Sequence, residues 1–399
     1  MRHPLYTILL LPIVCLPAWL PASAQSVPSG QAAGLSAQSS VSKDLLAIYE
    51  KTKTADDESD MTAIARNCAN VIQDRSRSAT DREYASSLFA WALNRRGELR
   101  GERAAELVEA GQVSQAKALD QKAVEDFATA VKYGKPSWRI HHNYAISLAM
   151  NGDYDGAIAQ FDEAIELKPD YANAHFNRAE LLFEQEQYRQ AIQGYDEAIR
   201  LNSGDPQYFN SRGHCQFILQ NHETALQDYR IAAEMGADSA TYQTDLADAY
   251  QYLGQWELAA NAYQAAIAIN SGYERAYRNA SWLMSTCPDS QFRNPELAVS
   301  AAKRAMELEV ARSFQTLETL AAANAARGRY QDAASLQRQA LELASSQEDR
   351  AELLQRLKLY EQERAYRQPE VDSSDRQRLA TAPDSSASSH IRTASGATR

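Results

Sequence analysis

Cysteine is scarce in this sequence, and its distribution indicates neither a disulfide framework nor a metal site. The 399 residues include 4 cysteines. Cys15 lies in an apolar N-terminal stretch, whereas Cys68, Cys215 and Cys287 are far apart and form no C-x-x-C pair. Small disulfide-rich domains and zinc sites both need closely spaced cysteines. With 44% hydrophobic residues, the fold must instead be stabilised by an apolar core.

Positive charge is also in deficit. The 41 lysine and arginine residues face 52 aspartate and glutamate residues, so the formal net charge is -11. Contact with nucleic-acid phosphates or with an anionic membrane surface calls for a basic face. We therefore expect no nucleic-acid partner.

Motifs of catalysis and cofactor binding are missing. The sequence has no G-x-S-x-G, H-E-x-x-H, P-loop or G-x-G-x-x-G pattern. His141, His142 and His175 could bind a metal or fill structural slots, and Cys287 could be a reactive thiol or pack in a loop. We favour the structural interpretations because no carboxylate or basic cluster completes a site. We expect no enzyme and no cofactor, with an unfamiliar active site as a remaining alternative.

The N-terminus has the layout of a secretory signal peptide. A basic start is followed by an apolar stretch and by Ala22-Ser23-Ala24, so we expect cleavage after residue 24. The alternative is an uncleaved membrane anchor. Residues 25–42 are expected to be a flexible linker because they are rich in Ser, Ala and Gly. The mature protein would then be exported, to the periplasm or beyond, and have no membrane span.

The most informative feature is a period of 34 residues. Alanine or a large aromatic residue returns at this spacing in several aligned columns. The columns are Ala157, Ala191, Ala225 and Ala259; Phe161, Tyr195, Tyr229 and Tyr263; and Ala164, Ala198, Ala232 and Ala266. Within each unit they follow the i, i+4, i+7 spacing of one helical face. A period of this length predicts a stacked array of helix pairs, in which each unit buries its apolar faces against its neighbours.

These columns resemble those of tetratricopeptide (TPR) repeats, which implies an all-α right-handed superhelical solenoid. The small residue of the first helix is Ala145, Ala179, Gly213 or Ala247 in successive units. We place four regular units in residues 138–273, a long-loop unit at 274–313 and a last unit at 314–347. The flanking regions are a divergent extended unit within 43–137, a capping helix at 348–367 and a disordered tail at 368–399.

Two short motifs make the layout similar to a group of exported bacterial TPR proteins. They are Thr286-Cys287-Pro288-Asp289 in the long loop, and Leu359-Tyr360-Glu361 followed by Tyr366-Arg367 after the last repeat. Most of that group has no known activity, so this resemblance informs the layout of the chain more than its function.

The TPR resemblance also implies a concave groove lined by the first helix of each unit. One inward column reads Asn143, Asn177, Ser211, Asp245 and Asn279, and it resembles the asparagine ladder of O-linked N-acetylglucosamine transferases. Asparagine can both donate and accept hydrogen bonds, so such a column suits the backbone of an extended peptide. The alternative is that asparagine is simply common there. The inward aromatic residues suit a peptide groove or packing between units; they are Phe176, Phe183, Phe217, Tyr252 and Trp282.

Charge divides the expected groove into acidic and basic parts. Glu180, Glu184, Asp245 and Asp248 make its middle acidic, whereas Arg139, Arg275 and Arg278 add positive charge at its two ends. The carboxylate clamp of chaperone-binding TPR proteins is not reproduced, because its lysine and asparagine positions hold His142 and Ile146.

From these features we predict a non-catalytic scaffold that binds an extended segment of a partner protein in the groove. The alternative is an assembly subunit of an envelope complex that acts through its convex face or its 287–296 loop.

Overall fold

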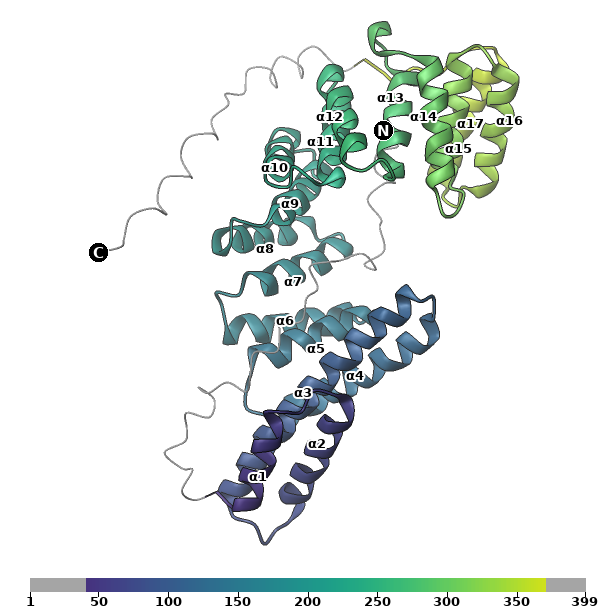
Figure 1. The fold of residues 1–399 in the computed structure, drawn as a ribbon. Helices are drawn as coiled ribbons and strands as arrows, with labels where there is room; N and C mark the ends of the chain where they lie inside the picture. The colour runs from purple at the N-terminus through teal and green to yellow at the C-terminus, as the bar shows by residue number, and fades with distance from the viewer. Residues whose placement is uncertain (1–40, 371–399) are drawn as a thin grey trace. The chain divides into compact units, whose positions relative to one another are not determined.

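The computed structural model describes residues 41–370, which fall into two compact units (Figure 1). We call residues 41–204 the N-terminal unit and residues 205–370 the C-terminal unit. Across both, the structure has 17 α-helices and no strand, so the all-α prediction is confirmed. The predicted signal peptide, most of the linker and residues 371–399 of the tail lie outside the described residues.

The N-terminal unit contains eight helices. They are α1 (Lys43–Thr52), α2 (Glu58–Gln73), α3 (Ala79–Glu109), α4 (Val113–Tyr133), α5 (Trp138–Met150), α6 (Tyr154–Leu167), α7 (Ala172–Glu184) and α8 (Tyr188–Leu201).

The C-terminal unit contains nine α-helices and a short 3-10 helix. They are α9 (Pro206–Ile218), α10 (His222–Met235), α11 (Ala240–Tyr252), α12 (Trp256–Ile269), α13 (Glu274–Thr286), η4 (Ser290–Phe292), α14 (Pro295–Leu308), α15 (Phe314–Ala326), α16 (Tyr330–Leu343) and α17 (Gln347–Glu361). In the described residues no helix has both the length and the apolar character needed to cross a membrane.

From α5 to α16 the helices alternate regularly between 13 and 14 residues. Gly152 and Gly254 join the two helices of their repeats in the left-handed conformation, which glycine adopts without a steric penalty. The alanine and aromatic columns that carry the period are 0–4% exposed, from Phe161 and Tyr195 at 0% to Tyr229 at 4%. Small residues therefore let two helices approach, and one aromatic ring fills the space between them.

The extended repeat near the N-terminus is built from unusually long helices. α3 has 31 residues and α4 has 21. They approach closely at Gly97, where a Cβ atom would lie 2.7 Å from the ring of Phe127. Arg96 and Arg100 both bind the buried Asp126, so ion pairs add to the apolar contact between the two helices.

The long-loop repeat holds its extra residues in a compact turn. α14 begins at Pro295, 39 residues after the start of α12 instead of the usual 34. Arg293 donates to the carbonyl oxygens of Cys287 and Pro288, each at 2.8 Å. Asn294 N then donates to Met284 O at 3.1 Å, which closes the loop onto the end of α13.

The capping helix is shorter than the sequence predicts. We expected a helix through residue 367, but α17 ends at Glu361. Glu363 has a φ of 55°, and Arg364 N donates to Leu359 O at 2.9 Å, so the chain turns out of the helix here. Residues 362–370, which we call the strap, then run back to the end of α13.

Candidate interaction face

The predicted asparagine ladder is used inside the N-terminal unit. Asn143 on α5 donates to Glu98 Oε1 on α3 at 2.7 Å. Asn177 Nδ2 on α7 lies 3.3 Å from His142 Nε2 on α5. Both asparagine side chains are buried, at 3% and 0% exposure. They connect the first helices of successive repeats and do not present their amides to solvent.

The same column has the same use in the C-terminal unit. Asn210 on α9 donates to Asp245 Oδ2 on α11 at 2.9 Å, and Asn279 on α13 donates to Asp248 Oδ1 at 2.8 Å. Asp245 and Asn279 are buried, whereas Ser211 is half-buried. A peptide would have to break these bonds to reach the amides, so we no longer place a backbone ladder on this column.

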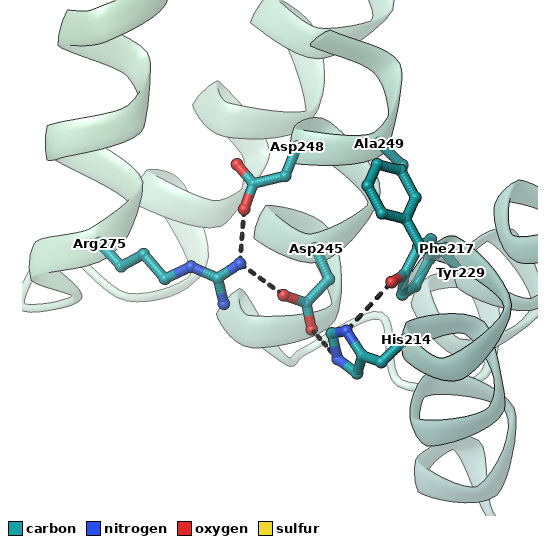
Figure 2. Close-up of a pocket in the computed structure, with 7 residues that line it drawn as sticks. All are labelled: His214, Phe217, Tyr229, Asp245, Asp248, Ala249 and Arg275. Atoms are coloured by element: carbon teal, nitrogen blue, oxygen red, sulfur yellow. Dashed lines mark hydrogen bonds and ion pairs between the residues drawn. The ribbon is translucent and has the colours of Figure 1, made fainter. Parts of the chain in front are cut away.

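A small pocket lies between the first helices α9, α11 and α13 and the second helix α10 of the C-terminal unit (Figure 2). Its volume is about 30 Å³, enough for a water molecule or a small polar group. Three consecutive repeats line it with His214, Phe217, Tyr229, Asp245, Asp248, Ala249 and Arg275.

Arg275 is the centre of the charges in this pocket. Its Nη2 atom lies 2.7 Å from Asp245 Oδ1 and 2.5 Å from Asp248 Oδ2. His214 lies between Asp245, with Nε2 to Oδ2 at 3.4 Å, and the hydroxyl of Tyr229, at 3.0 Å from Nδ1. Arg275 Nε has no hydrogen-bond partner among the described residues, so the guanidinium keeps a donor.

Burial and ion pairing oppose each other at these groups. Burial alone would raise the pKa of Asp245, but Arg275 and His214 hold it well below its usual range. Burial would lower the pKa of Arg275, whereas Asp245 and Asp248 raise it well above its ordinary value. The pocket thus contains a buried ion pair, Asp245 with Arg275, that stays charged at neutral pH. This corrects the expected charge pattern, because Arg275 neutralises part of the acidic middle.

Most of the predicted groove aromatics are covered by neighbouring side chains. Phe176, Phe217 and Trp282 are 1%, 7% and 9% exposed, whereas Phe183 and Tyr252 are half-buried. Phe217 packs edge-on against Tyr252, with ring centroids 4.8 Å apart. Packing between helices is therefore the observed use of these rings, and Tyr252 and Phe183 alone keep substantial exposed surface.

Comparisons with known proteins agree with the repeat pattern. A family model described as TPR repeat matches residues 147–185, and one described as tetratricopeptide repeat matches residues 176–240. The chain is a TPR protein. None of the curated proteins compared with it matches. TPR repeats in general bind protein or peptide partners and act as non-catalytic scaffolds.

Several solved structures share similarity with this TPR chain. MamA is 20% identical, with 41% of this chain and 93% of MamA covered and a TM-score of 0.37. YrrB, described as a TPR protein with an unusual peptide-binding site, is 20% identical over 49% of this chain and 97% of its own, with a TM-score of 0.40. Yeast Tom70 is 16% identical, with 76% of this chain and 59% of Tom70 covered and a TM-score of 0.45. At these values, no conclusion about a ligand follows.

The histidines of the TPR array have structural partners. His141 Nδ1 lies 2.9 Å from Gln160 Oε1, and His175 Nε2 lies 2.9 Å from the carbonyl oxygen of Pro169. His142 is buried between the rings of Phe161 and Tyr171, which it meets edge-on. These separate contacts do not bring the three histidines to one metal.

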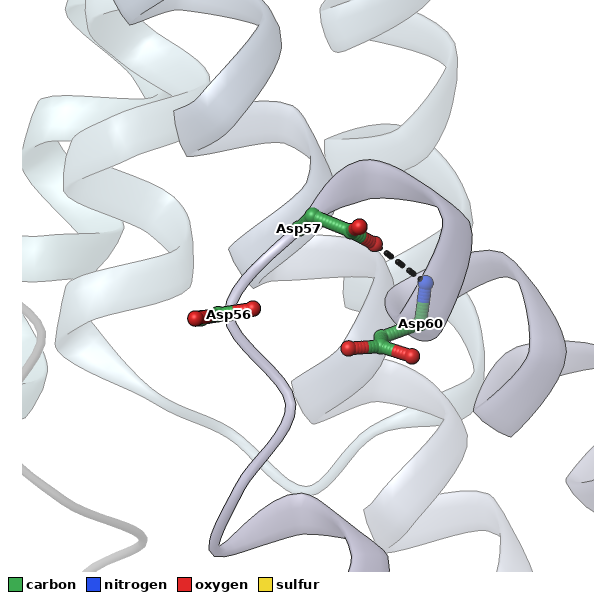
Figure 3. Close-up of side chains that lie close together, drawn as sticks. All are labelled: Asp56, Asp57 and Asp60. Atoms are coloured by element: carbon green, nitrogen blue, oxygen red, sulfur yellow. Dashed lines mark hydrogen bonds between the residues drawn. The ribbon is translucent and has the colours of Figure 1, made fainter.

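Among the described residues, one cluster of side chains is spaced closely enough to hold a metal ion, and it is exposed near the start of α2 (Figure 3). It consists of Asp56, Asp57 and Asp60. Asp57 is the N-cap of α2, and its Oδ1 atom accepts from Asp60 N at 2.7 Å. Helix capping and the helix dipole explain these residues without an ion.

The three cysteines of the described chain are buried and form no disulfide. Cys287 is 0% exposed and packs in the apolar cluster that includes Trp256 and Leu283. Burial also raises the pKa of Cys68 to about 12. A buried thiol in an apolar cluster is a poor nucleophile, which agrees with the packing role proposed for Cys287.

Sequence reasoning missed the ionic partners of the groove residues. It placed Arg275 at one end of the groove and Asp245 and Asp248 in its middle, although adjacent repeats bring them together. The signal was available in part: Asp248 and Arg275 lie 27 residues apart on the inner positions of neighbouring first helices.

We predict that His142 makes the N-terminal unit sensitive to acid. Burial lowers its pKa to about 4, from an ordinary value of 6.5. Between these values the unfolded chain binds a proton that the folded chain does not, so stability falls as the pH falls from 6.5 to 4. The loss from this group is about 3 kcal/mol between pH 7 and pH 4.

The comparison of His142→Gln with the wild type measures this effect. Urea unfolding at pH 7 and pH 4 should show a smaller loss for His142→Gln, since glutamine carries no titrating group. Equal losses in His142→Gln and the wild type would show that His142 does not cause the acid sensitivity.

Proposed function

We propose that this protein is a non-catalytic interaction scaffold outside the cytoplasm. Its first helices hold an extended segment of a partner protein. The predicted signal peptide supports the location, and the TPR repeats support a protein partner.

The pocket around Arg275 is the observation that carries the proposal. Three repeats contribute to it, and Phe217 and Tyr229 form apolar walls beside the charged cluster. Both oxygens of Asp248 and Oδ2 of Asp245 already accept hydrogen bonds from the chain. Asp245 Oδ1 lies 2.7 Å from Arg275 Nη2 as an ion pair, and Arg275 Nε has no hydrogen-bond partner among the described residues. Because the ion pair with Arg275 already engages Asp245 Oδ1, the N–H group of Arg275 Nε is the donor that is left for a ligand. We expect a hydrogen-bond acceptor of the partner, such as a peptide carbonyl, to enter here.

Ser211 allows the face to be blocked without breaking the buried network. It is half-buried on α9, the first helix of its repeat, and belongs to the predicted groove column. Arginine at this position would project bulk and charge over the face. We expect Ser211→Arg to reduce crosslinked capture of the partner from an envelope extract by at least about tenfold. Thermal melting of the variant should stay close to that of the wild type.

The matched control is Gln227→Arg, an exposed position on α10, the second helix of the same repeat. It adds the same side chain to the other face of the array, so capture should be retained. Equal capture by both variants would move the partner away from the first helices. The assembly alternative would then take precedence, and a variant with a shortened 287–296 loop would test it.

The loop gives that alternative a specific basis. Although Arg293 pins its two ends, Ser290, Gln291 and Asn294 are exposed. A rigid loop with an exposed polar tip presents a fixed surface to a neighbouring subunit.

A further inference from the structure

The strap lies across the inner face of the last repeats. α13 and α15 are the first helices of their repeats, and α17 follows them as the capping helix. Ala365 and Tyr366 pack against an apolar cluster formed by α15, α16 and α17. Strap residues further along reach the end of α13. The strap therefore occupies the face on which a partner segment is proposed to lie.

Tyr366 anchors the strap in a slot that is formed by Trp282 and Arg356. The ring of Tyr366 lies 5.8 Å from that of Trp282, and the guanidinium carbon of Arg356 lies 5.3 Å from the Trp282 ring and 4.9 Å from the Tyr366 ring. Arg356 forms ion pairs with Glu318 on α15 and with Glu352 on its own helix, α17. The slot is thus preorganised by ion pairs that do not involve the strap.

The next two residues satisfy the end of a helix. The last carbonyl groups of a helix have no partner within it. Arg367 Nη1 donates to Ser285 O at 3.0 Å, and Gln368 N donates to Thr286 O at 2.8 Å, both near the end of α13. The positive charge of Arg367 is also favoured by the negative end of the helix dipole.

We propose that this face of α13, α15 and α17 is a binding slot for an extended segment with an aromatic residue followed by arginine. The chain's own residues 365–368 occupy the slot as an intramolecular ligand. An aromatic anchor, a cation at the helix end and a main-chain hydrogen bond are contacts that an extended peptide makes with a groove. A partner segment that extends over the last repeats must have the same chemistry and must displace the strap.

The inference rests on the proposed function, because the inner face is taken as the partner's site. It adds a constraint to that function. Since the strap is tethered a few residues from the slot, its effective concentration there is on the order of millimolar. A weakly binding partner segment is therefore excluded, and partners that match the slot are favoured.

The test uses the full chain and a labelled synthetic peptide with the sequence of residues 362–370. The double variant Tyr366→Ala/Arg367→Ala empties the slot but leaves Trp282, Arg356 and α17 in place. Fluorescence anisotropy should show that this variant binds the peptide at least about tenfold more tightly than the wild type. The milder variant Arg367→Gln should fall between the two.

Two controls identify the slot. A peptide with alanine in place of the tyrosine and the arginine should not bind the emptied chain. Adding Trp282→Leu to the double variant should abolish binding of the natural peptide. Equal binding by the wild type and the emptied chain, or no binding by the emptied chain at millimolar peptide, would overturn the proposal.

Exchange of straps between two copies is the remaining outcome. A wild-type dimer that becomes monomeric in the double variant would overturn the intramolecular assignment. None of these measurements needs the natural partner. Failure of the peptide test with retained dependence of capture on Ser211 would remove the strap proposal alone, and the opposite pattern would remove the proposed function alone.

Discussion

Replacing Arg275 with methionine is expected to destabilise the C-terminal unit by about 3–5 kcal/mol, because it leaves two carboxylates facing each other without their cation. The side chain of Asp245 is 2% exposed and that of Asp248 is 12% exposed. For a unit of this size, such a loss lowers the melting temperature by on the order of 10 °C. Hydrogen exchange in α11 and α13 localises the effect.

The pH dependence of this variant separates lost charge pairing from lost packing. In the wild type the pKa of Asp245 lies below its ordinary value, so its contribution is present at neutral pH and is lost only as the pH falls through the acidic range. Without Arg275, burial raises that pKa, and the folded chain takes up a proton that the unfolded chain releases. The penalty should therefore shrink from pH 7 to pH 5. A penalty that is the same at both pH values would indicate packing alone.

The control is Arg304→Met, which removes an exposed arginine paired with Glu307 in the same unit. Exposed pairs contribute about 0–1 kcal/mol, so this variant should melt close to the wild type. If Arg275→Met has the same melting temperature as Arg304→Met, water reaches the carboxylates of Asp245 and Asp248. The ion pair would then not be buried as described above.

The repeat architecture could be predicted because it depends on local and periodic information. Alanine and aromatic residues 34 apart, such as Ala157 and Ala191, can hold their positions only if each unit repeats the same helix pair. Since neighbouring units contact each other, a period in sequence becomes a period in space. The 13- and 14-residue helices and the apolar core follow from that rule.

The use of the asparagine column could not be predicted in the same way. Its inward position is a property of one helix, but its exposure depends on how closely the next first helix approaches. Asn143 meets Glu98 45 residues earlier in the chain, and Asn279 meets Asp248 31 residues earlier. These separations differ from the period, so the columns of the sequence do not align the partners.

The strap was missed for a different reason. Residues 362–370 have no apolar period, and the prediction divided them between a capping helix and a disordered tail. Their order comes from single contacts with distant residues, above all Tyr366 with Trp282 and Arg367 with Ser285. The two short motifs shared with exported bacterial TPR proteins gave a hint of this contact. One contains Thr286 and the other ends at Arg367, and the strap brings these two segments together at the end of α13.

Replacing Arg356 with methionine should destabilise the protein as much as Arg275→Met does. The effect should fall on the last helices. Arg356 binds the buried Glu318, and its guanidinium lies against both rings of the slot. Burial raises the pKa of Glu318 and the ion pair with Arg356 opposes that rise, so without the cation the carboxylate is left unpaired in a dry site. We expect a loss of about 3–5 kcal/mol at neutral pH and faster hydrogen exchange in residues 347–370.

The double variant Arg356→Met/Glu318→Met decides which interaction carries the loss. Removing both members of a buried pair is often near neutral, whereas removing one leaves an unpaired charge. We therefore expect the double variant to recover most of the stability that the single variant loses, while Arg338→Met, which breaks an exposed pair with Glu361, changes little. If the double variant stays as unstable as Arg356→Met, the loss comes from the contact of the guanidinium with Trp282 and Tyr366. The strap would then be a main support of the last repeats, and its displacement by a partner would loosen α17.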